Sequence, residues 1–175
     1  MKTKTIIKLL AICIAFICTA TQCKKEEEKP KLPPETQIGA DTFGALVNGE
    51  VFLRKAQFGF LGVRAEYNQL SDILTIRASG NIFGKTERSV SLFLTVLNPK
   101  ENEKRKFMSF EYWEGDSRIT VHNTGEFVLT KLEITDNQFS PAYAIVCGTF
   151  ACDVSPSIKI TQGRFDIGRL AITGR

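Results

Sequence analysis

Apolar and polar residues alternate along most of the chain after residue 38, and this period of two predicts β-strands. Short runs of Gly, Asn, Asp and Ser separate the alternating segments, as expected for turns. No segment after residue 35 has the spacing of an amphipathic helix. The predicted strands cover residues 42–47, 50–54, 57–67, 73–78, 89–97, 107–113, 118–122, 127–134, 143–154, 157–161 and 164–167.

Several local features predict how these strands are arranged. Asn48-Gly49 lies between the first two strands and predicts a type I′ hairpin turn, which needs positive φ at both central residues. Segments 89–97 and 143–154 are apolar on both faces, which predicts central strands covered on both sides. Gly163 separates two out-of-phase apolar runs and predicts a bulge or bend. The pattern predicts an all-β domain: an antiparallel β-sandwich or a partly open barrel of about ten strands.

The first 22 residues have the pattern of a secretion signal. A lysine-rich start precedes an apolar stretch between residues 6 and 18, which Lys8 interrupts. Its uninterrupted part is about ten residues, too short for a membrane-spanning helix of about 20. The small-residue run that follows ends in Cys23 and resembles a lipobox, in which the cysteine thiol receives a diacylglyceryl group. We therefore expect an exported lipoprotein anchored to the membrane through Cys23; the alternative is an ordinary signal cut after Ala20.

Residues 23–38 have the composition of a flexible tether, and residues 39–175 are predicted to form a single β domain. The tether begins Cys-Lys-Lys-Glu-Glu-Glu and continues into a proline-rich stretch, which is typical of a solvated, extended spacer. Lysine followed by acidic residues resembles the export signal of Bacteroidota surface lipoproteins, which implies display on the outer face of the outer membrane. An anchor that faces the periplasm and a charged linker without a sorting role are the alternatives.

Charge argues against a nucleic-acid partner. The chain has 23 basic and 19 acidic residues and a formal net charge of +4. Three of its lysines lie in the predicted signal, so 20 basic residues remain against 19 acidic ones. A nearly neutral mature chain has no overall attraction to a phosphate backbone.

The cysteines predict neither a disulfide nor a metal site. Two of the five leave with the signal, and Cys23 is the predicted lipid site. Cys147 and Cys152 lie in one predicted strand at an odd spacing, which places them on opposite faces and about 16 Å apart. A disulfide needs Cα atoms within about 7 Å, so we predict free thiols that pack as small apolar groups. A structural zinc site needs about four ligands, and we expect no metal and no cofactor.

Three segments resemble a family of small Bacteroidota lipoproteins of unknown function. They are LPPETQIGADTFGALVNGEVF (residues 32–52), GEFVLTKLEITDNQF (125–139) and CGTFACDV with IKITQGRFDI (147–167). The resemblance implies an all-β fold and export, and it carries no known activity, substrate or catalytic residue. The closing Gly-Arg-Phe-Asp, residues 163–166, therefore has a structural interpretation: a glycine for the bend, then an arginine and an aspartate that fix a strand end.

Signatures of catalysis are few. His122 is the only histidine, and no G-x-S-x-G motif accompanies it, so no nucleophile with a base is indicated. Asp136-Asn137-Gln138 offers oxygen ligands but lacks the spacing of a calcium loop and predicts a hairpin turn. Glycoside hydrolysis needs two carboxyl groups about 5–9 Å apart, although exposed charges at strand ends explain the same acids. The acids considered for such a pair are Glu111, Glu114, Asp116, Glu133, Asp136, Asp153 and Asp166.

Segment 107–113 is the most informative for binding. Alternation predicts two faces, one with Met108, Phe110 and Tyr112 and the other with Phe107, Ser109, Glu111 and Trp113. The second face is mixed, so the only tryptophan is predicted to be partly exposed beside Glu111. An aromatic ring next to an acid suits stacking on a sugar or contact with a protein. Trp113 and Glu111 are therefore the candidate ligand contacts; the alternative is that Trp113 covers the end of the core.

Taken together, these features predict a non-enzymatic, lipid-anchored β-domain that binds a glycan or an envelope protein at the cell surface. A small carbohydrate-active hydrolase with paired carboxylates is the first alternative. A structural or accessory subunit of an envelope complex is the second.

Overall fold

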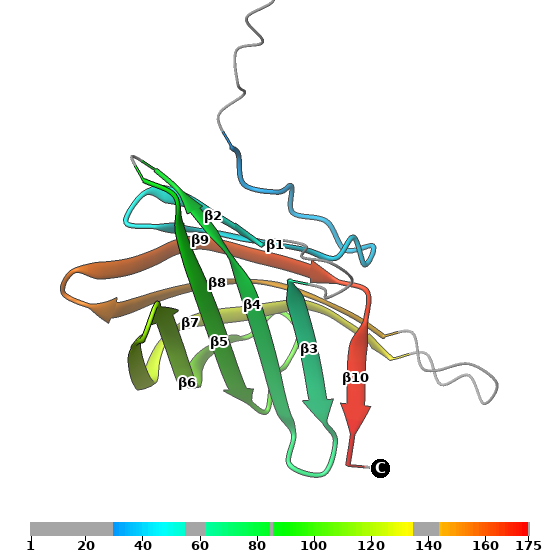
Figure 1. The fold of residues 1–175 in the computed structure, drawn as a ribbon. Helices are drawn as coiled ribbons and strands as arrows, with labels where there is room; N and C mark the ends of the chain where they lie inside the picture. The colour runs from blue at the N-terminus through cyan, green and yellow to red at the C-terminus, as the bar shows by residue number, and fades with distance from the viewer. Residues whose placement is uncertain (1–29, 55–61, 85, 135–143, 175) are drawn as a thin grey trace, which may run out of the picture.

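The computed structural model describes residues 30–54, 62–84, 86–134 and 144–174 (Figure 1). Over these residues the protein is all-β, as predicted. Eight antiparallel strands close into a barrel, and two further strands extend one side of it. The strands are β1 (Thr42–Val47), β2 (Glu50–Arg54), β3 (Val63–Asn68), β4 (Ile73–Phe83), β5 (Arg88–Leu97), β6 (Lys104–Glu114), β7 (Ser117–Ile134), β8 (Ala144–Ser155), β9 (Ile158–Ile167) and β10 (Leu170–Thr173).

Closure of the barrel depends on β4. The strand order is β4-β2-β1-β9-β8-β7-β6-β5, and β5 pairs with β4 to complete the ring. One edge of β4 pairs with β5 along residues 73–82. The other edge is divided, because β3 pairs with residues 73–78 and β2 with residues 80–83. β10 pairs in parallel with β3, so these two strands continue the sheet beyond the barrel wall (Figure 1).

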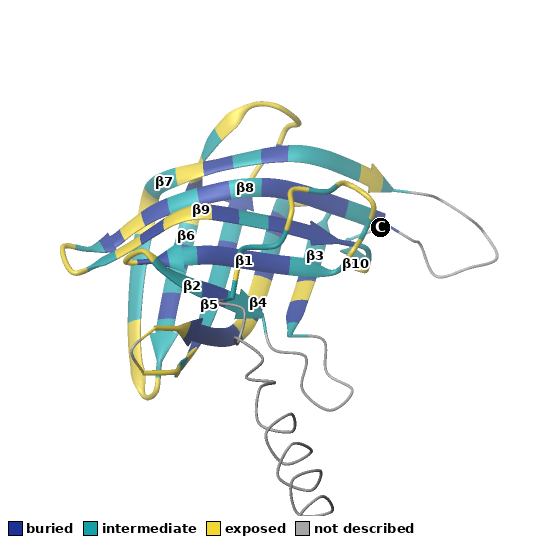
Figure 2. Cartoon of the chain, turned by 90° about the horizontal axis from the view of Figure 1, so that it is seen from above, coloured by how far each residue is buried: buried dark blue, intermediate teal, exposed yellow. Residues whose placement is uncertain are grey.

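Phenylalanine rings fill the barrel. Alternate residues of each strand point inward, which produces the bands of buried and less buried positions in Figure 2. Burying one such ring stabilises the fold by about 1.5–3 kcal/mol. The largest fully buried side chains include Phe43, Phe52, Phe107, Phe110 and Phe127.

Two glycines make room for neighbouring rings. A Cβ atom at Gly163 would lie 2.6 Å from the ring of Phe150, and one at Gly148 would lie 2.7 Å from the ring of Phe165. These positions therefore allow a ring to pack directly against backbone. The β8–β9 pairing shifts register between Phe150 and Cys152, opposite the residues that precede Gly163, which confirms the predicted bulge.

Local turn chemistry was predictable, whereas strand length was less so. Asn48 and Gly49 have φ of 52° and 83°, which confirms the predicted turn. β7 runs unbroken through residues 117–134, where two strands were predicted. Asn123 and Gly125, with φ of 52° and 73°, interrupt the alternation without ending the strand.

Other strands also differ from the prediction. β4 extends to Phe83 rather than ending near residue 78, β9 runs unbroken through residues 158–167 where two strands were predicted, and β10 was not predicted. Ser79-Gly80-Asn81 has the composition of a turn. In the structure, Gly80 instead lies against the backbone of Leu53 on β2, where a Cβ atom would clash with the carbonyl. Of the predicted strand 57–67, the first part lies outside the described residues.

The predicted facing of β6 is partly wrong. Phe107 is buried in the core together with Phe110 and Tyr112, whereas Met108 is 40% exposed. The pairing of β6 with β7 shifts register between Arg105 and Phe107. The extra residue of this β-bulge is on β7, where Gly125 leaves room for the Phe107 ring: a Cβ atom at Gly125 would lie 2.7 Å from it.

The two strands predicted to be covered on both sides differ from each other. β5 has one buried face, but Leu97 on its other face is 52% exposed and Phe93 is partly exposed. β8 is buried on its inner face, but its outer face is buried only at Cys147, and Asp153 on that face is exposed. Cys152 belongs to the core cluster, and Cys147 is buried on the outer face against Asp166. Both thiols are free and lie on opposite faces, as predicted.

The cover over the outside of β8 and β9 is formed by residues 33–39, here called the N-terminal strap. Asp166 of β9 is only 1% exposed and binds the strap with its carboxylate. Thr36 Oγ1 donates to it at 2.5 Å, the Gly39 amide at 2.7 Å and the Ile38 amide at 3.1 Å. Residues assigned to the tether from sequence are thus hydrogen-bonded to the barrel.

Asp166 is a charged anchor for this strap. Burial by itself would raise the pKa of Asp166, but hydrogen bonds from Thr36, Cys147, Ile38 and Gly39 hold that pKa below its ordinary value. The Cys147 thiol donates to the same carboxylate at 3.1 Å. Burial first, and then this hydrogen bond, raise the pKa of Cys147 to about 12.

Candidate ligand-binding surface

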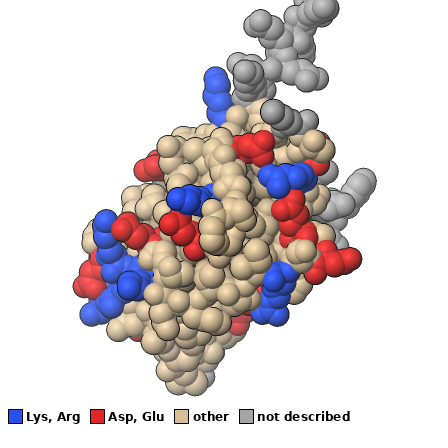
Figure 3. Space-filling view, turned by 90° about the vertical axis from the view of Figure 1, so that its left-hand side faces the viewer, with Lys and Arg blue, Asp and Glu red and all other residues tan. Residues whose placement is uncertain are grey.

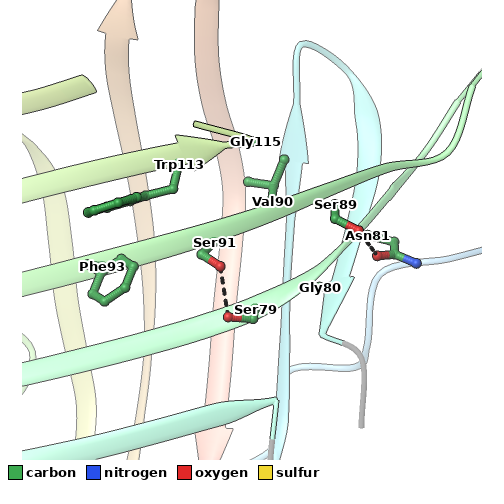
Figure 4. Close-up of a pocket in the computed structure, with 9 residues that line it drawn as sticks. All are labelled: Ser79, Gly80, Asn81, Ser89, Val90, Ser91, Phe93, Trp113 and Gly115. Atoms are coloured by element: carbon green, nitrogen blue, oxygen red, sulfur yellow. Dashed lines mark hydrogen bonds between the residues drawn. The ribbon is translucent and has the colours of Figure 1, made fainter. Parts of the chain in front are cut away.

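The outer face of β4, β5 and β6 carries a shallow depression of about 440 Å³. Most of the side chains that line it alternate along their strands with core residues, so they project away from the barrel interior. Figure 4 shows a row of small polar side chains with the two aromatic rings at one end. The lining residues are Ser79, Gly80, Asn81, Ser89, Val90, Ser91, Phe93, Trp113 and Gly115.

Small polar groups form the floor of this depression. Ser79 on β4 and Ser91 on β5 are directly opposite, with their Oγ atoms 2.8 Å apart. In the next pair on the same face, two residues along each strand, Ser89 Oγ donates to Asn81 Oδ1 at 3.1 Å. The Asn81 amide group donates to Glu87. Because a serine hydroxyl can both donate and accept, each retains hydrogen-bonding capacity for a ligand.

Trp113 stands beside this floor in a fixed orientation. Its Nε1 donates to Glu111 Oε2 at 2.9 Å, and Arg118 Nη2 contacts Glu111 Oε1 at 2.7 Å. The Arg118 guanidinium carbon lies 5.0 Å from the centroid of the Trp113 ring, within the range of a cation–π interaction. The Trp113 side chain is therefore held by a carboxylate and a cation on the outer surface.

Phe93 continues the aromatic surface on β5. Its ring centroid lies 5.7 Å from that of Trp113, with the planes tilted by 43°. On its other side the Arg77 guanidinium carbon lies 5.5 Å from the Phe93 centroid. Arg77, Phe93, Trp113 and Arg118 thus form a row across β4, β5, β6 and β7, which we call the arginine–aromatic row.

Of the other candidate residues, His122 and Glu133 have structural partners, whereas Asp116 and Asp153 are exposed. His122 Nδ1 lies 3.2 Å from the Met108 carbonyl oxygen on an exposed part of β7. Glu133 pairs with Lys131 at 2.7 Å. Asp136 and its neighbours lie outside the described residues. Over the described part of the chain, no three His, Cys, Asp or Glu side chains are grouped so as to hold a metal ion.

Two carboxylates do come together at one end of the barrel. Arg88 contacts Glu50 and Glu114 through different guanidinium nitrogens, each at 3.0 Å. The Tyr112 hydroxyl donates to Glu114 at 2.7 Å, and burial first, with this bond, raises the pKa of Tyr112. The Arg88 guanidinium lies between the carboxylates of Glu50 and Glu114. It fills the space that the oxygen of a glycosidic bond would need between two catalytic acids. Acidic and basic side chains are also intermixed over the side of the molecule in Figure 3.

Sequence reasoning located part of this surface. Glu111 and Trp113 are two residues apart on one strand, so alternation alone indicated that they are neighbours, and the structure places them in contact. Phe93, Ser79 and Ser91 were missed, because the pairing register that brings them to Trp113 is not visible in a single sequence. The serines at alternate positions of β5 were the available signal.

Comparison with family models, curated proteins and solved structures found no match to the chain. In the described residues, no helix is both long and apolar enough to cross a membrane.

Proposed function

We propose that this protein is an exported, lipid-anchored, non-enzymatic module that binds glycans on the outer face of β4–β6. The observation that carries the proposal is the pair of rings, Phe93 and Trp113, beside a floor of serine and asparagine side chains. Sugars present apolar C–H faces and hydroxyl groups together, so they are recognised by rings next to small hydrogen-bonding groups. Small-molecule sites also combine an apolar surface with a few polar groups that fix orientation.

The position of Trp113 supplies a direct assay. It is the only tryptophan of the chain, so intrinsic tryptophan fluorescence reports on this surface alone. The purified protein would be screened on a glycan array and then titrated with each array ligand while emission is recorded. A saturable shift in emission supports the proposal; ligands that bind without changing emission would place the site elsewhere.

Variants test which residues make the contact. Phe93→Ala and Ser91→Ala are expected to weaken binding, because each removes a part of the lining while leaving the core intact. Thr149→Ala is the matched control, since it removes a hydroxyl from the outer face of β8, away from Trp113. Equal affinity in all three variants would contradict the assignment. Chromatography of the glycan after incubation tests the non-enzymatic part, which glycan cleavage would overturn.

Anchoring is tested separately through Cys23. Cells that produce the wild type or Cys23→Ala would be labelled with a fatty-acid probe and shaved with protease. Labelling and shaving of the wild type but not of the variant support a surface lipoprotein. A labelled wild type that resists shaving would indicate a periplasm-facing anchor, and no difference between the two would contradict lipidation.

A further inference from the structure

Two arginines beside the depression are directly opposite each other. Arg64 on β3 and Arg77 on β4 are cross-strand partners, and both side chains are exposed on the outer face. Among the residues that the structure describes, neither makes an ion pair. Like charges directly opposite each other destabilise a sheet. In the described part of the fold, the contact of Arg77 with the Phe93 ring is the favourable interaction recorded for the pair.

The position of Arg77 connects this charge to the aromatic surface. Its guanidinium carbon lies 5.5 Å from the Phe93 ring centroid, so the cation is adjacent to the ring rather than extended away from it. Arg118 occupies the corresponding place against Trp113. With strands about 4.8 Å apart, the positions from β4 to β7 span roughly 14 Å. The rings are thus flanked by a cation at each end.

In the described residues, the acidic side chains on this face form no ion pair with the opposed arginines. Glu111 is engaged by Arg118 and by the Trp113 ring nitrogen. Glu66, on the same face of β3, accepts a hydrogen bond from Thr173 Oγ1 at 3.2 Å. The guanidinium N–H donors of Arg64 and Arg77 thus have no carboxylate partner in the described residues, and arginine binds oxyanions such as carboxylate and sulfate through paired N–H donors.

We propose that the glycan is anionic: its carboxylate or sulfate groups bind Arg64 and Arg77 while its sugar rings contact Phe93 and Trp113. This inference rests on the proposed glycan-binding function and narrows it to one class of ligand. Binding is expected to weaken as salt concentration rises, since exposed charges are screened.

The test uses ligands that differ in charge alone. Trp113 fluorescence would be titrated with polygalacturonate and its methyl ester, and with dextran sulfate and dextran. Arg64→Gln/Arg77→Gln would be compared with Lys100→Gln/Lys159→Gln, which removes the same charge elsewhere on the surface. We expect tighter binding of at least one charged polymer than of its neutral partner, and a loss of about tenfold or more in the arginine variant only.

The outcomes separate the two proposals. If neutral ligands from the array bind and no charged member of either pair binds more tightly, the anionic class is wrong and glycan binding stands. If no glycan changes Trp113 emission, the proposed function fails. If both double variants lose affinity equally, binding reflects overall charge and the assignment to Arg64 and Arg77 is overturned. Comparison of the two charged polymers shows whether carboxylate or sulfate is the group bound.

Discussion

Removal of the Asp166 carboxylate tests whether the N-terminal strap is part of the folded domain. Three strap donors, on Thr36, Ile38 and Gly39, bind this one side chain. A hydrogen bond to a charged group contributes about 1.5–3 kcal/mol. In Asp166→Ala the strap can detach and rehydrate its donors, which recovers part of the loss. We therefore expect the free energy of unfolding to fall by about 2–4 kcal/mol.

Urea denaturation of the purified protein gives this change, and amide hydrogen exchange at Ile38 and Gly39 gives its location. Asp153→Ala is the matched control, because Asp153 is an exposed aspartate on β8. The control is expected to change stability by less than about 0.5 kcal/mol. If Asp166→Ala matches the control, or if exchange at residues 38 and 39 is unchanged, the strap does not depend on this carboxylate.

The pH dependence gives an independent check with a defined sign. The pKa of Asp166 is lowered in the folded state, below the unfolded value of about 3.9. Its contribution is therefore fully present above that pH and is lost as the pH falls through the folded-state pKa. The difference in stability between wild type and Asp166→Asn should shrink in this acidic range. A constant difference across it would show that charge is not the cause.

Three further predictions follow from packing and titration. Gly163→Ala should lower the unfolding free energy by about 1–3 kcal/mol in urea melts, because the new methyl group meets the Phe150 ring; an unchanged midpoint would contradict this. Asn48→Ala should lower the free energy of unfolding by about 1–2 kcal/mol in urea melts, because the Asn48 side chain makes two hydrogen bonds of 2.8 Å to the β8–β9 hairpin. An unchanged free energy of unfolding would contradict this. Burial, together with nearby carboxylates, raises the pKa of both Cys147 and Cys152 to about 12. Their stabilisation is complete below about pH 8.5 and lost as pH rises toward 12, and rapid thiol alkylation of the native protein at pH 8 would refute their burial.

The parts of the fold that were predictable from sequence are those that local chemistry determines. Asn48-Gly49 predicted its turn because both residues tolerate positive φ. The apolar pattern of residues 89–97 predicted a strand covered on both faces; the strand and its buried inner face are confirmed, whereas the cover on the outer face is not. The facing of Phe107 and Met108 was wrong, because the space that Gly125 on β7 leaves for the Phe107 ring depends on the partner strand and leaves no mark in the local pattern of β6.

What could not be predicted depends on pairing between distant segments. The choice of a closed barrel over a sandwich rests on the β1–β9 and β4–β5 pairings, which alternation does not specify. The same limit applies to the candidate surface. Glu111 and Trp113 were found through their spacing, whereas Phe93 and the opposed Arg64 and Arg77 reach it only through strand register.

The pairing of β1 with β9 also determines when the molecule can fold. Phe43 of β1 is opposite Phe165 of β9, which is synthesised much later. The N-terminal strap likewise lacks its hydrogen-bond acceptor until Asp166 has been synthesised. During synthesis from the N-terminus, β1 therefore has no β9 to pair with until most of the polypeptide has been made. Contacts between segments so far apart in sequence form slowly. The ring therefore cannot close before β9 has been synthesised, in whatever order the other strands pair.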